Sequence, residues 1–343
     1  MYRTVRWVFA SSWIVAAIAV LPTAITPAPA QDWPTRPITM VVPYAAGAGV
    51  DVTGRILSPR LSKLLRQQVI VENVSGAGGM AGAARVARAP PDGYQFVLGN
   101  TATHAQIQAA SKHPAYNAAS DFAPVVLIAQ TPQVLLTRKD LPANNLQQFI
   151  SQAKQVNMQY GSAGAGSPGH LTCALLNTAT GINAIHIPYR GAAPVLQDLI
   201  AGRIDYLCTI APSVIPQLEN NTVKAIAVLS RERSPTLPTL ASASEQGLAN
   251  FDASTWFAFF FPKSTPATIV AKLHDVAIEV MDNPAVRERM KEIGNDLVAP
   301  ERRSSEYLQK YVESEIGKWT AVIKAAGISA QWPSPTFAPR PTT

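Results

Sequence analysis

The chain has 343 residues, of which 47% are hydrophobic and 15% are charged, and its formal net charge is +7. This length is enough for two domains of ordinary size, and the hydrophobic content predicts a globular protein with buried cores. Lysine and arginine are spread along the chain without a dense block, which argues against a nucleic-acid-binding protein. The mild positive charge weakly favours small anions as ligands.

The first thirty residues have the pattern of a secretory signal peptide. Arg3 and Arg6 form a basic start, Val8–Leu21 is apolar apart from two serines, and Ala28-Pro29-Ala30 is a small-x-small cleavage site. The apolar run is shorter than the roughly 20 residues that a membrane span needs. We therefore expect cleavage near Ala30 and a periplasmic or secreted protein with a net charge of 7 − 2 = +5, because the segment contains two arginines and no acid.

After the predicted cleavage site, apolar runs of strand length alternate with segments of helical spacing. The expected elements are a strand at Ile38–Val42, a helix at Val52–Leu65 with Asp51 as its N-cap, a strand at Val69–Val74, a helix at Met80–Arg88 and a strand at Gln95–Gly99. This alternation predicts a parallel sheet with helices on both faces.

The apolar run Phe122–Ala129 stops near Pro132 and resumes at Val134–Thr137, which predicts a strand that leaves the first domain and enters a second. The second domain repeats the alternation of the first. Its expected elements are helices at Asn145–Val156, His170–Ala179 and Ala193–Ala201, and strands at Met158–Tyr160, Ala184–Pro188, Ile204–Ile210 and Val223–Leu229.

The run Ser254–Phe261 predicts a second strand, which crosses back to the first domain. Helices are expected after it at Pro266–Met281, Pro284–Ile293 and Ser304–Ala326, and residues 331–343 are expected to be disordered. The predicted division is a signal peptide at 1–30, a first lobe at 33–131 and 255–330, and a second lobe at 132–254. Two lobes joined by two crossings can hinge around a cleft.

The chain has two cysteines, Cys173 and Cys208. They could pair in an oxidising compartment, but two buried thiols, one on a helix and one on a strand, are the favoured prediction. The histidines show no metal-binding spacing, so we expect neither a metal nor another cofactor.

Three glycine-rich turns each follow a predicted strand and precede a predicted helix: Gly47-x-Gly49, Gly76-x-Gly78 and Gly164-x-Gly166. Such a turn directs main-chain N–H groups and the positive end of the helix dipole at one point, which suits an anion. A dinucleotide-binding fold begins in the same way, but the first turn lacks the third glycine, and no acidic residue ends a following strand. We therefore expect a carboxylate rather than a nucleotide. For the turn at Ser75–Gly82, a purely conformational role is an equal alternative.

Ser162, Ser167 and His170 raise the alternative of a hydrolase. The nucleophile-elbow pattern needs glycine at position 165, where the chain has Ala165. Ser167 is better suited to cap the helix that Pro168 begins, and a capping hydroxyl can also turn toward an anion.

Two charged residues are candidates for ligand contact. Asp51 is expected first as a helix cap paired with Arg55, and second as a partner for a ligand amino or hydroxyl group. Arg190, beside Tyr189 at a strand end, is the expected partner of a ligand carboxylate, with a surface arginine as the alternative. Trp256 is expected to pack at the hinge rather than to line the cleft.

Five stretches together resemble the periplasmic solute-binding proteins of tripartite tricarboxylate transporters, the TctC or Bug family. They are PYAAGAGVDVTGR, VENVSGAGGMAGA, GSAGAGSPGHL, HIPYRGAAPVLQDLIAGRIDY and STWFAFFFPKSTPATIVAKL. The resemblance covers nearly all of Trp33–Ile328, and the combination is specific although each stretch alone is not.

The resemblance implies an α/β fold of the two-lobed periplasmic binding protein type II, with two Rossmann-like domains joined by two crossing strands. In the family two loops hold a carboxylate through main-chain amides, hydroxyls and bridging waters, and here they correspond to Tyr44–Asp51 and Ser162–His170. The family usually has a Gly-Gly pair in the first loop, whereas this chain has Gly47-Ala48-Gly49, and alanine enters positive φ only at a cost. The residues expected to bind the ligand are Tyr44, Ala46, Gly47, Ala48, Gly49, Val50, Asp51, Asn100, Thr101, His104, Ser162, Ala163, Gly164, Gly166, Ser167, His170, Tyr189, Arg190, Gly191 and Asp205.

The predicted function is that of a periplasmic solute-binding protein that is not an enzyme. It would capture a small carboxylate by lobe closure, deliver it to a membrane permease, and work as a monomer. Family ligands include tricarboxylates, dicarboxylates, acidic amino acids and aromatic acids, and the sequence selects none of them. The alternatives are a secreted serine-type hydrolase and a ligand-sensing partner of a membrane receptor.

Overall fold

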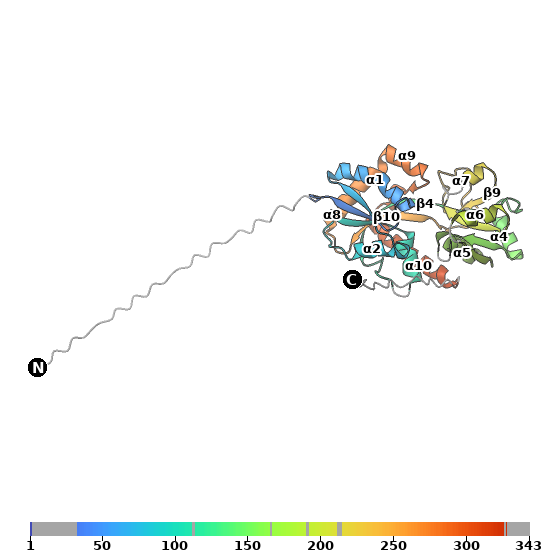
Figure 1. Ribbon diagram of the computed structural model, residues 1–343, viewed down its shortest axis with the longest axis horizontal. Helices are drawn as coiled ribbons and strands as arrows, with labels where there is room; N and C mark the ends of the chain where they lie inside the picture. Colours follow the sequence, from blue (N-terminus) through green and yellow to red (C-terminus); the bar gives the residue numbers. More distant parts are fainter. Residues whose placement is uncertain are drawn as a thin grey trace, which may run out of the picture. The chain divides into compact units, whose positions relative to one another are not determined.

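The structure, a computed structural model, describes Met1 and residues 33–111, 114–164, 167–189, 192–210, 215–325 and 327. The residues from Trp33 onward form one compact unit. Within it, elements of the two sheets gather on the left and right of Figure 1, with β4 and β10 labelled between them. The predicted signal peptide and the C-terminal tail lie outside the described residues.

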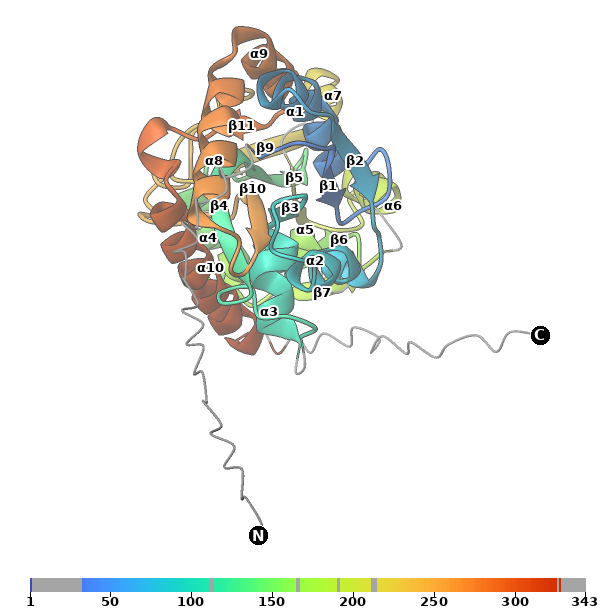
Figure 2. The same cartoon turned by 90° about the vertical axis from the view of Figure 1, so that its left-hand side faces the viewer.

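The first sheet has the strand order β11-β4-β10-β3-β1-β2. Figure 2 shows β4, β10, β3, β1 and β2 of this sheet from left to right. Its strands are β1 (Ile38–Val42), β2 (Val69–Asn73), β3 (Gln95–Asn100), β4 (Phe122–Thr131), β10 (Thr255–Pro262) and β11 (Asp296–Leu297). The strands β1, β2 and β3 are parallel, as the alternation predicted.

The alternation did not predict the direction of the crossing strands. The strand β10 runs antiparallel to both β3 and β4. It has this direction because it enters the sheet at the edge where β3 ends, as the pair Phe257 and Asn100 shows. The two-residue strand β11, which runs antiparallel to β4, was too short to predict from a pattern.

The second sheet has the strand order β7-β6-β8-β5-β9. Its strands are β5 (Gln133–Arg138), β6 (Gln159–Ser162), β7 (Ile185–Pro188), β8 (Tyr206–Ile210) and β9 (Val223–Val228). The strands β6, β7 and β8 are parallel, whereas β5 runs antiparallel to β8 and β9. The chain passes from the first sheet to the second between β4 and β5, at Pro132, and returns between β9 and β10, which confirms the two predicted crossings.

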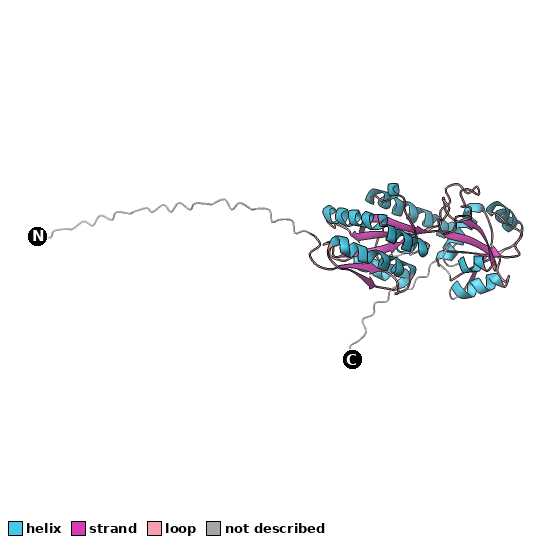
Figure 3. Cartoon of the chain, turned by 90° about the horizontal axis from the view of Figure 1, so that it is seen from above, coloured by secondary structure: helices cyan, strands magenta, loops and turns pink. Residues whose placement is uncertain are grey.

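Helices lie on both sides of the strands in Figure 3, as expected for this fold class. They are α1 (Gly49–Leu65), α2 (Met80–Ala87), α3 (Ile107–Ala110), α4 (Leu146–Gln155), α5 (Pro168–Thr180), α6 (Ala192–Ile200), α7 (Ile215–Glu219), α8 (Ala267–Asp282), α9 (Pro284–Glu292) and α10 (Ser305–Ala325). The short helices α3 and α7 were not predicted, since neither has enough turns for a periodic pattern. Among the described residues, none of the helices has the length and apolarity needed to cross a membrane.

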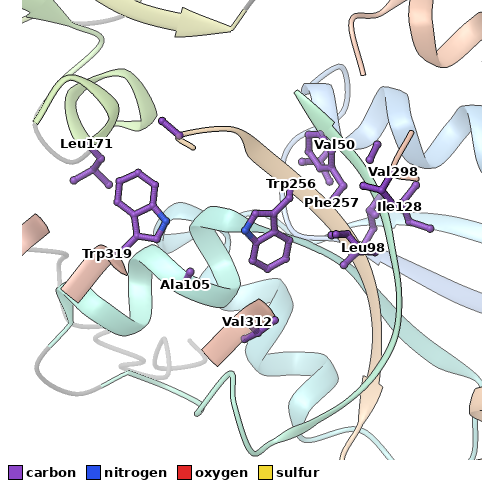
Figure 4. Packing of buried hydrophobic residues seen from close by; sticks show 14 of the residues in the cluster. Val50, Leu98, Ala105, Ile128, Leu171, Trp256, Phe257, Val298, Val312 and Trp319 are labelled. Atoms are coloured by element: carbon purple, nitrogen blue, oxygen red, sulfur yellow. The ribbon is translucent and has the colours of Figure 1, made fainter. Parts of the chain in front are cut away.

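The C-terminal helix α10 links the two halves of the fold, since it contacts β4 of the first sheet and α5 beside the second. Figure 4 shows Trp319 of α10 near Leu171 of α5, with Trp256 of β10 farther along the cluster. Both indole N–H groups donate to the buried Glu315 Oε2, Trp256 at 3.1 Å and Trp319 at 3.2 Å. Glu315 also pairs with Lys318. Trp256 is therefore a packing residue at the crossing, as expected.

Cys173 and Cys208 form a disulfide that joins α5 to β8. The favoured prediction of two free thiols is wrong. The helix α5 packs on β8, and this brings the two Cα atoms within 5.6 Å, in the range that a disulfide requires. The 35-residue separation along the chain gave no sign of this proximity.

Candidate functional site

The carboxyl ends of the parallel strands in both sheets point toward the crossing segments. Asn100, the last residue of β3, pairs with Phe257 near the start of β10, and Ile210, the last residue of β8, pairs with Gln133 at the start of β5. Gln133 Nε2 donates to Thr255 Oγ1 at 3.2 Å, which joins the starts of the two crossing strands. Because ligands of open α/β sheets bind beyond the carboxyl ends of the strands, this region is the candidate cleft.

The first loop, Tyr44–Asp51, connects β1 to α1. Gly47 takes the positive φ of +83°, while Ala48 stays extended at φ −65° and ψ 154°. The alanine that departs from the family pattern therefore sits at a position that any residue can adopt. Val50, at the first turn of α1, is buried in the apolar core and is drawn near Phe257 in Figure 4. The end of the loop is therefore packed into the core.

The prediction that Asp51 caps α1 is wrong, because the helix begins at Gly49 and its N-cap is Ala48. Asp51 lies inside the first turn, and its carboxylate reaches back to accept the Gly47 N–H at 2.8 Å. It also accepts from Arg55 Nε at 3.0 Å, which confirms the expected pair, and from Asn73 Nδ2 at 2.9 Å.

Asp51 is only 2% exposed, and the partners of its carboxylate keep it ionised. Burial alone would raise its pKa, but the hydrogen bonds from Arg55, Gly47 and Asn73 outweigh burial, and the pKa is lowered. The carboxylate is thus engaged in holding the loop to α1 and β2, which favours a structural role over direct contact with a ligand.

The first turn of α1 has main-chain donors for an anion. The helical hydrogen bonds start with the Val52 N–H, which donates to Ala48 O at 3.0 Å, so the amides of Gly49, Val50 and Asp51 precede the first bond of the helix. A Cβ on either Gly47 or Gly49 would meet no atom within 4 Å. The loop therefore faces open space, and its amides can reach a ligand.

The second loop, Ser162–His170, connects β6 to α5, and its residues 165 and 166, including the predicted ligand residue Gly166, lie outside the described part of the chain. Ser162 Oγ lies 2.7 Å from His186 Nε2 and donates to Gly164 O at 2.9 Å. Ser167 caps α5, with its hydroxyl accepting the His170 N–H at 3.4 Å, and Pro168 begins the helix. The predicted cap is confirmed.

Two imidazoles stack behind the second loop. The rings of His170 and His186 lie 3.7 Å apart between centroids and are nearly parallel, at 6°. Burial, and secondly the charge of His186, lower the pKa of His170 to about 4, and burial also lowers the pKa of His186. Both rings are therefore neutral at pH 7, and the Ser162 hydroxyl has an uncharged partner.

Two predicted ligand residues are not part of the cleft. His104 is fully buried and stacked on Phe260 at 4.0 Å, and burial lowers its pKa to about 3. Asp205 precedes β8, so it lies at the amino end of that strand, where it accepts from the Gln159 N–H at 2.8 Å and Arg138 Nε at 3.1 Å. Both predictions are wrong, the first because the ring turns inward and the second because the residue lies at the opposite edge of the sheet.

The remaining candidates of the first lobe lie around the end of β3, where Tyr44 fastens the first loop to β3 and Thr101 fastens β3 to β10. The Tyr44 hydroxyl donates to Asn100 Oδ1 at 3.2 Å, and Thr101 Oγ1 accepts the main-chain N–H of Trp256 at 2.8 Å. Burial raises the pKa of Tyr44 to about 12, although the bond to Asn100 acts in the opposite direction. Ala46, at the tip of the loop, is exposed. These contacts place Tyr44, Asn100 and Thr101 at the edge of the cleft, and their contact with a ligand stays a prediction.

In the second lobe, Ala163 is exposed and Tyr189 donates its hydroxyl to Asp198 Oδ2 at 2.7 Å. Arg190 and Gly191 lie outside the described residues. Sequence reasoning missed Gln133, which is 1% exposed and lines a pocket beside the second loop. Its buried Oε1 atom has no partner among the described groups. A polar residue directly after Pro132, at the head of an apolar strand, was the available signal.

A pocket of about 800 Å³ is lined by segments 230–235 and 296–302 and by part of α10. None of its described lining residues belongs to either glycine-rich loop. Two of its charged groups have partners within the fold, since Lys318 pairs with Glu315, and Arg302 donates to Tyr307 Oη and Gln130 Oε1. This pocket is therefore separate from the candidate cleft.

Comparison with known proteins identifies the family. The model of the family described as "Tripartite tricarboxylate transporter family receptor" (TctC) matches residues 53–328. The chain belongs to this family. TctC proteins are periplasmic solute-binding receptors and not a family of enzymes.

Relatives match over nearly their whole length. The chain is 38% identical to a UPF0065 protein of Agrobacterium vitis over 316 residues, which cover 90% of this chain and 91% of the relative. It is 30% identical to the protein BugT of Bordetella pertussis, over 88% of this chain and 92% of that protein.

Solved structures of the family share the two-lobed binding-protein fold. A TctC solute-binding protein from Polaromonas has a TM-score of 0.76 at 28% identity, over 85% of this chain and 99% of that one. MatC from Rhodopseudomonas palustris, solved with malate, has a TM-score of 0.68 at 35% identity, over 85% of this chain and 100% of that one. Another R. palustris protein, solved with adipate, has a TM-score of 0.70 at 35% identity, over 87% of this chain and 99% of that one. The fold predicted from the sequence is confirmed.

Proposed function

We propose that this TctC-family protein captures a small carboxylate between its two glycine-rich loops and delivers it to a membrane permease. The observation that carries the proposal is the position of both loops at the carboxyl ends of their sheets, next to the crossing segments that Gln133 and Thr255 join. Structural relatives solved with malate and with adipate support a carboxylate as the ligand. The lobes, at 33–131 with 255–330 and at 132–254, would close on it by hinging at the two crossings.

Main-chain amides would supply most of the hydrogen bonds to the ligand carboxylate. In the first loop these are the amides of Gly49, Val50 and Asp51, because the Gly47 amide already donates to the Asp51 carboxylate. In the second loop they are amides of the turn that precedes α5, with the hydroxyl of Ser167. Arg190 would add a charged partner for the carboxylate. Hydrogen bonds from amides to an ionised group are stronger than those between neutral groups, so a few of them suffice for a small acid.

The direct test is calorimetric titration of the folded protein with a panel of organic acids, guided by native mass spectrometry of freshly purified protein, which identifies a retained ligand. We expect at least one carboxylate to bind in one-to-one ratio. Absence of binding by every acid, with the folded state shown by circular dichroism, contradicts the proposal.

The role of the first loop is tested by Gly49→Val, with Gly317→Val in α10 as the matched control. A Cβ at either glycine meets no atom within 4 Å, so neither variant is expected to disturb the packing. Gly49→Val should weaken binding roughly tenfold or more by obstructing the loop, a change of about 1.4 kcal/mol in binding free energy. Equal affinities in the two variants would show that the first loop does not hold the ligand.

The N-terminal segment supports secretion through a signal peptide cleaved near Ala30, and the mature protein would act as a monomer in the periplasm. A membrane permease of the tripartite type is the expected partner, and a receptor that senses the closed form is the alternative. A pull-down from membranes with and without ligand distinguishes the two, because the captured protein is either a transporter subunit or a signalling receptor.

The hydrolase alternative now has a different candidate pair, since Ser162 Oγ and His186 Nε2 lie 2.7 Å apart whereas Ser167 caps a helix. The Ser162 hydroxyl also bonds to both main-chain groups of Gly164 and is 3% exposed, which favours a structural role. We expect no ester hydrolysis above buffer. Turnover that is abolished by Ser162→Ala would overturn this expectation.

A further inference from the structure

The second loop borders a pocket of about 420 Å³, a size typical of small-molecule sites. The pocket lies among the ends of β6 and β8 and the starts of α5 and α6, with Gln133 at the crossing. The described residues that line it include Gln133, Ser162, Ser167, Val195, Leu207 and Ile210. A ligand whose carboxylate is held by the second loop would extend its other end into this space.

The pocket has polar groups at the loop and toward the crossing, and its sides are apolar. Among the described lining residues, Ser162 and Ser167 lie at the loop, Gln133 and Thr209 lie toward the crossing, and Val195, Leu196, Leu207 and Ile210 form the apolar sides. Every described lining residue is uncharged. A second carboxylate placed against these walls would lose its water without gaining a partner, which is costly.

The walls are already in place without a ligand. Val195 and Leu207 belong to a buried apolar cluster. A Cβ on Gly161 would collide with Val195 and Ile204, so β6 packs tightly against this side of the pocket. On the opposite side, a Cβ on Gly169 would come within 2.5 Å of Cys208 O, and the disulfide from Cys208 to Cys173 fixes α5 to β8. A preformed apolar pocket selects ligands by shape at little reorganisation cost.

We propose that the ligand is a carboxylate with an extended apolar segment, either an alkyl chain of four or more carbons or an aromatic ring, and that the Val195–Leu196–Leu207–Ile210 pocket houses this segment. The inference rests on the proposed function and narrows its ligand class. Short hydroxylated acids such as malate and citrate have no apolar segment to fill this space, and a second carboxylate against the Val195, Leu196, Leu207 and Ile210 side chains would lose its water, so they would bind weakly.

The test is calorimetry at constant pH and ionic strength with butyrate, hexanoate, octanoate and benzoate, and with malate and citrate. Each added methylene that enters the pocket should raise the affinity about fourfold until the pocket is filled. Benzoate and hexanoate should bind roughly tenfold or more tightly than malate and citrate.

Two variants on α6 assign the effect to the pocket. Leu196→Asn removes part of the apolar wall at a half-buried position and should flatten the dependence on chain length. Ile200→Asn, an exposed position on the same helix that does not line the pocket, should leave that dependence intact.

The outcomes separate the two proposals. A chain-length dependence that Leu196→Asn flattens and Ile200→Asn retains supports the pocket. Malate or citrate binding more tightly than hexanoate and benzoate, or a wild-type affinity independent of chain length, overturns the apolar class while leaving carboxylate capture in place. Absence of binding by every acid contradicts carboxylate capture itself.

Discussion

The two glycine-rich loops have similar sequences but are held by different chemistry. The first is fastened by a buried carboxylate, since Asp51 binds the Gly47 amide, Arg55 and Asn73. The second is fastened by a hydroxyl and an imidazole, through Ser162 and His186, and by the cap at Ser167. An ionised group holds one loop at neutral pH, and uncharged groups hold the other.

Their glycines also serve different purposes. Gly49 faces open space, so in the first loop the missing side chain leaves room for a ligand. Gly169, at the end of the second loop, lies against the main chain of β8, so there the missing side chain permits close packing. The comparison teaches that glycines after a strand can mark either an approach to a ligand or an approach to the protein's own backbone.

The largest effect is expected from Gly169→Ala. The new Cβ would come within 2.5 Å of Cys208 O, a main-chain atom that cannot move aside cheaply. We expect the free energy of unfolding to fall by up to about 3 kcal/mol, the usual cost of overpacking. Denaturant titration measures it, with Gly49→Ala as the control that should stay within about 0.5 kcal/mol of wild type. Similar losses in both variants would refute the contrast between the two glycines.

A somewhat smaller effect is expected from Asp51→Ala, which leaves the Gly47 amide and Asn73 without their carboxylate partner. Hydrogen bonds to a charged group contribute about 1.5–3 kcal/mol, so the free energy of unfolding should fall by about 2 kcal/mol. Since the pKa of Asp51 is lowered in the folded state, its contribution is present above pH 4 and is lost as the pH falls through the folded pKa. A variant as stable as wild type at pH 7 would show that the carboxylate does not hold the first loop.

A pH effect should distinguish the second loop from the first. The folded pKa of His170 is lowered to about 4, so between pH 6.5 and 4 the unfolded chain binds a proton there that the folded protein does not. The free energy of unfolding should therefore fall as the pH is lowered through this window. The pKa of His104 is also lowered, to about 3, so its protonation in the unfolded chain likewise reduces stability at low pH. His170→Phe and His104→Phe should therefore each remove part of the dependence of the free energy of unfolding on pH. Denaturation curves at pH 7.5, 5.5 and 4.5 measure both, and slopes equal to that of wild type in both variants would contradict the assignment.

The smallest effect is expected from Ser167→Ala. The cap bond to the His170 N–H is long, at 3.4 Å, and loss of an N-cap hydroxyl costs about 1 kcal/mol. We expect a loss of about 0.5–1 kcal/mol in the free energy of unfolding, with Ser167→Asp restoring most of it because aspartate caps equally well. A larger loss that Ser167→Asp does not restore would mean that the hydroxyl has another structural role.

The sequence predicted most element positions because apolar periodicity reports directly on burial. It gave β1, the two crossings and α10 to within a residue or two. The sequence did not predict the direction of β10, because a buried strand has the same apolar run whether its neighbours are parallel or antiparallel to it. Nor did the sequence predict the disulfide, since the pairing of Cys173 with Cys208 depends on how α5 docks on β8.

Within the candidate site, local signals succeeded where the relevant contact is local. Ser167 as a cap and the pair of Asp51 with Arg55 are examples, since both involve residues one helical turn apart. His104 failed because the ring it packs on, Phe260, comes from a strand far along the chain. Asp205 failed for an avoidable reason, because a residue before a strand lies at its amino end.

The shared carboxylate of Glu315 gives the molecule an intrinsic optical reporter. Trp256 belongs to a crossing strand and Trp319 to the helix that reaches α5, yet both indoles donate to the same buried oxygen atom. A rotation of one lobe against the other would alter the local electric field at one or both rings. Ligand capture could then be followed by unlabelled tryptophan fluorescence, and the part of the change that is lost in Trp256→Phe or in Trp319→Phe would be assigned to that indole.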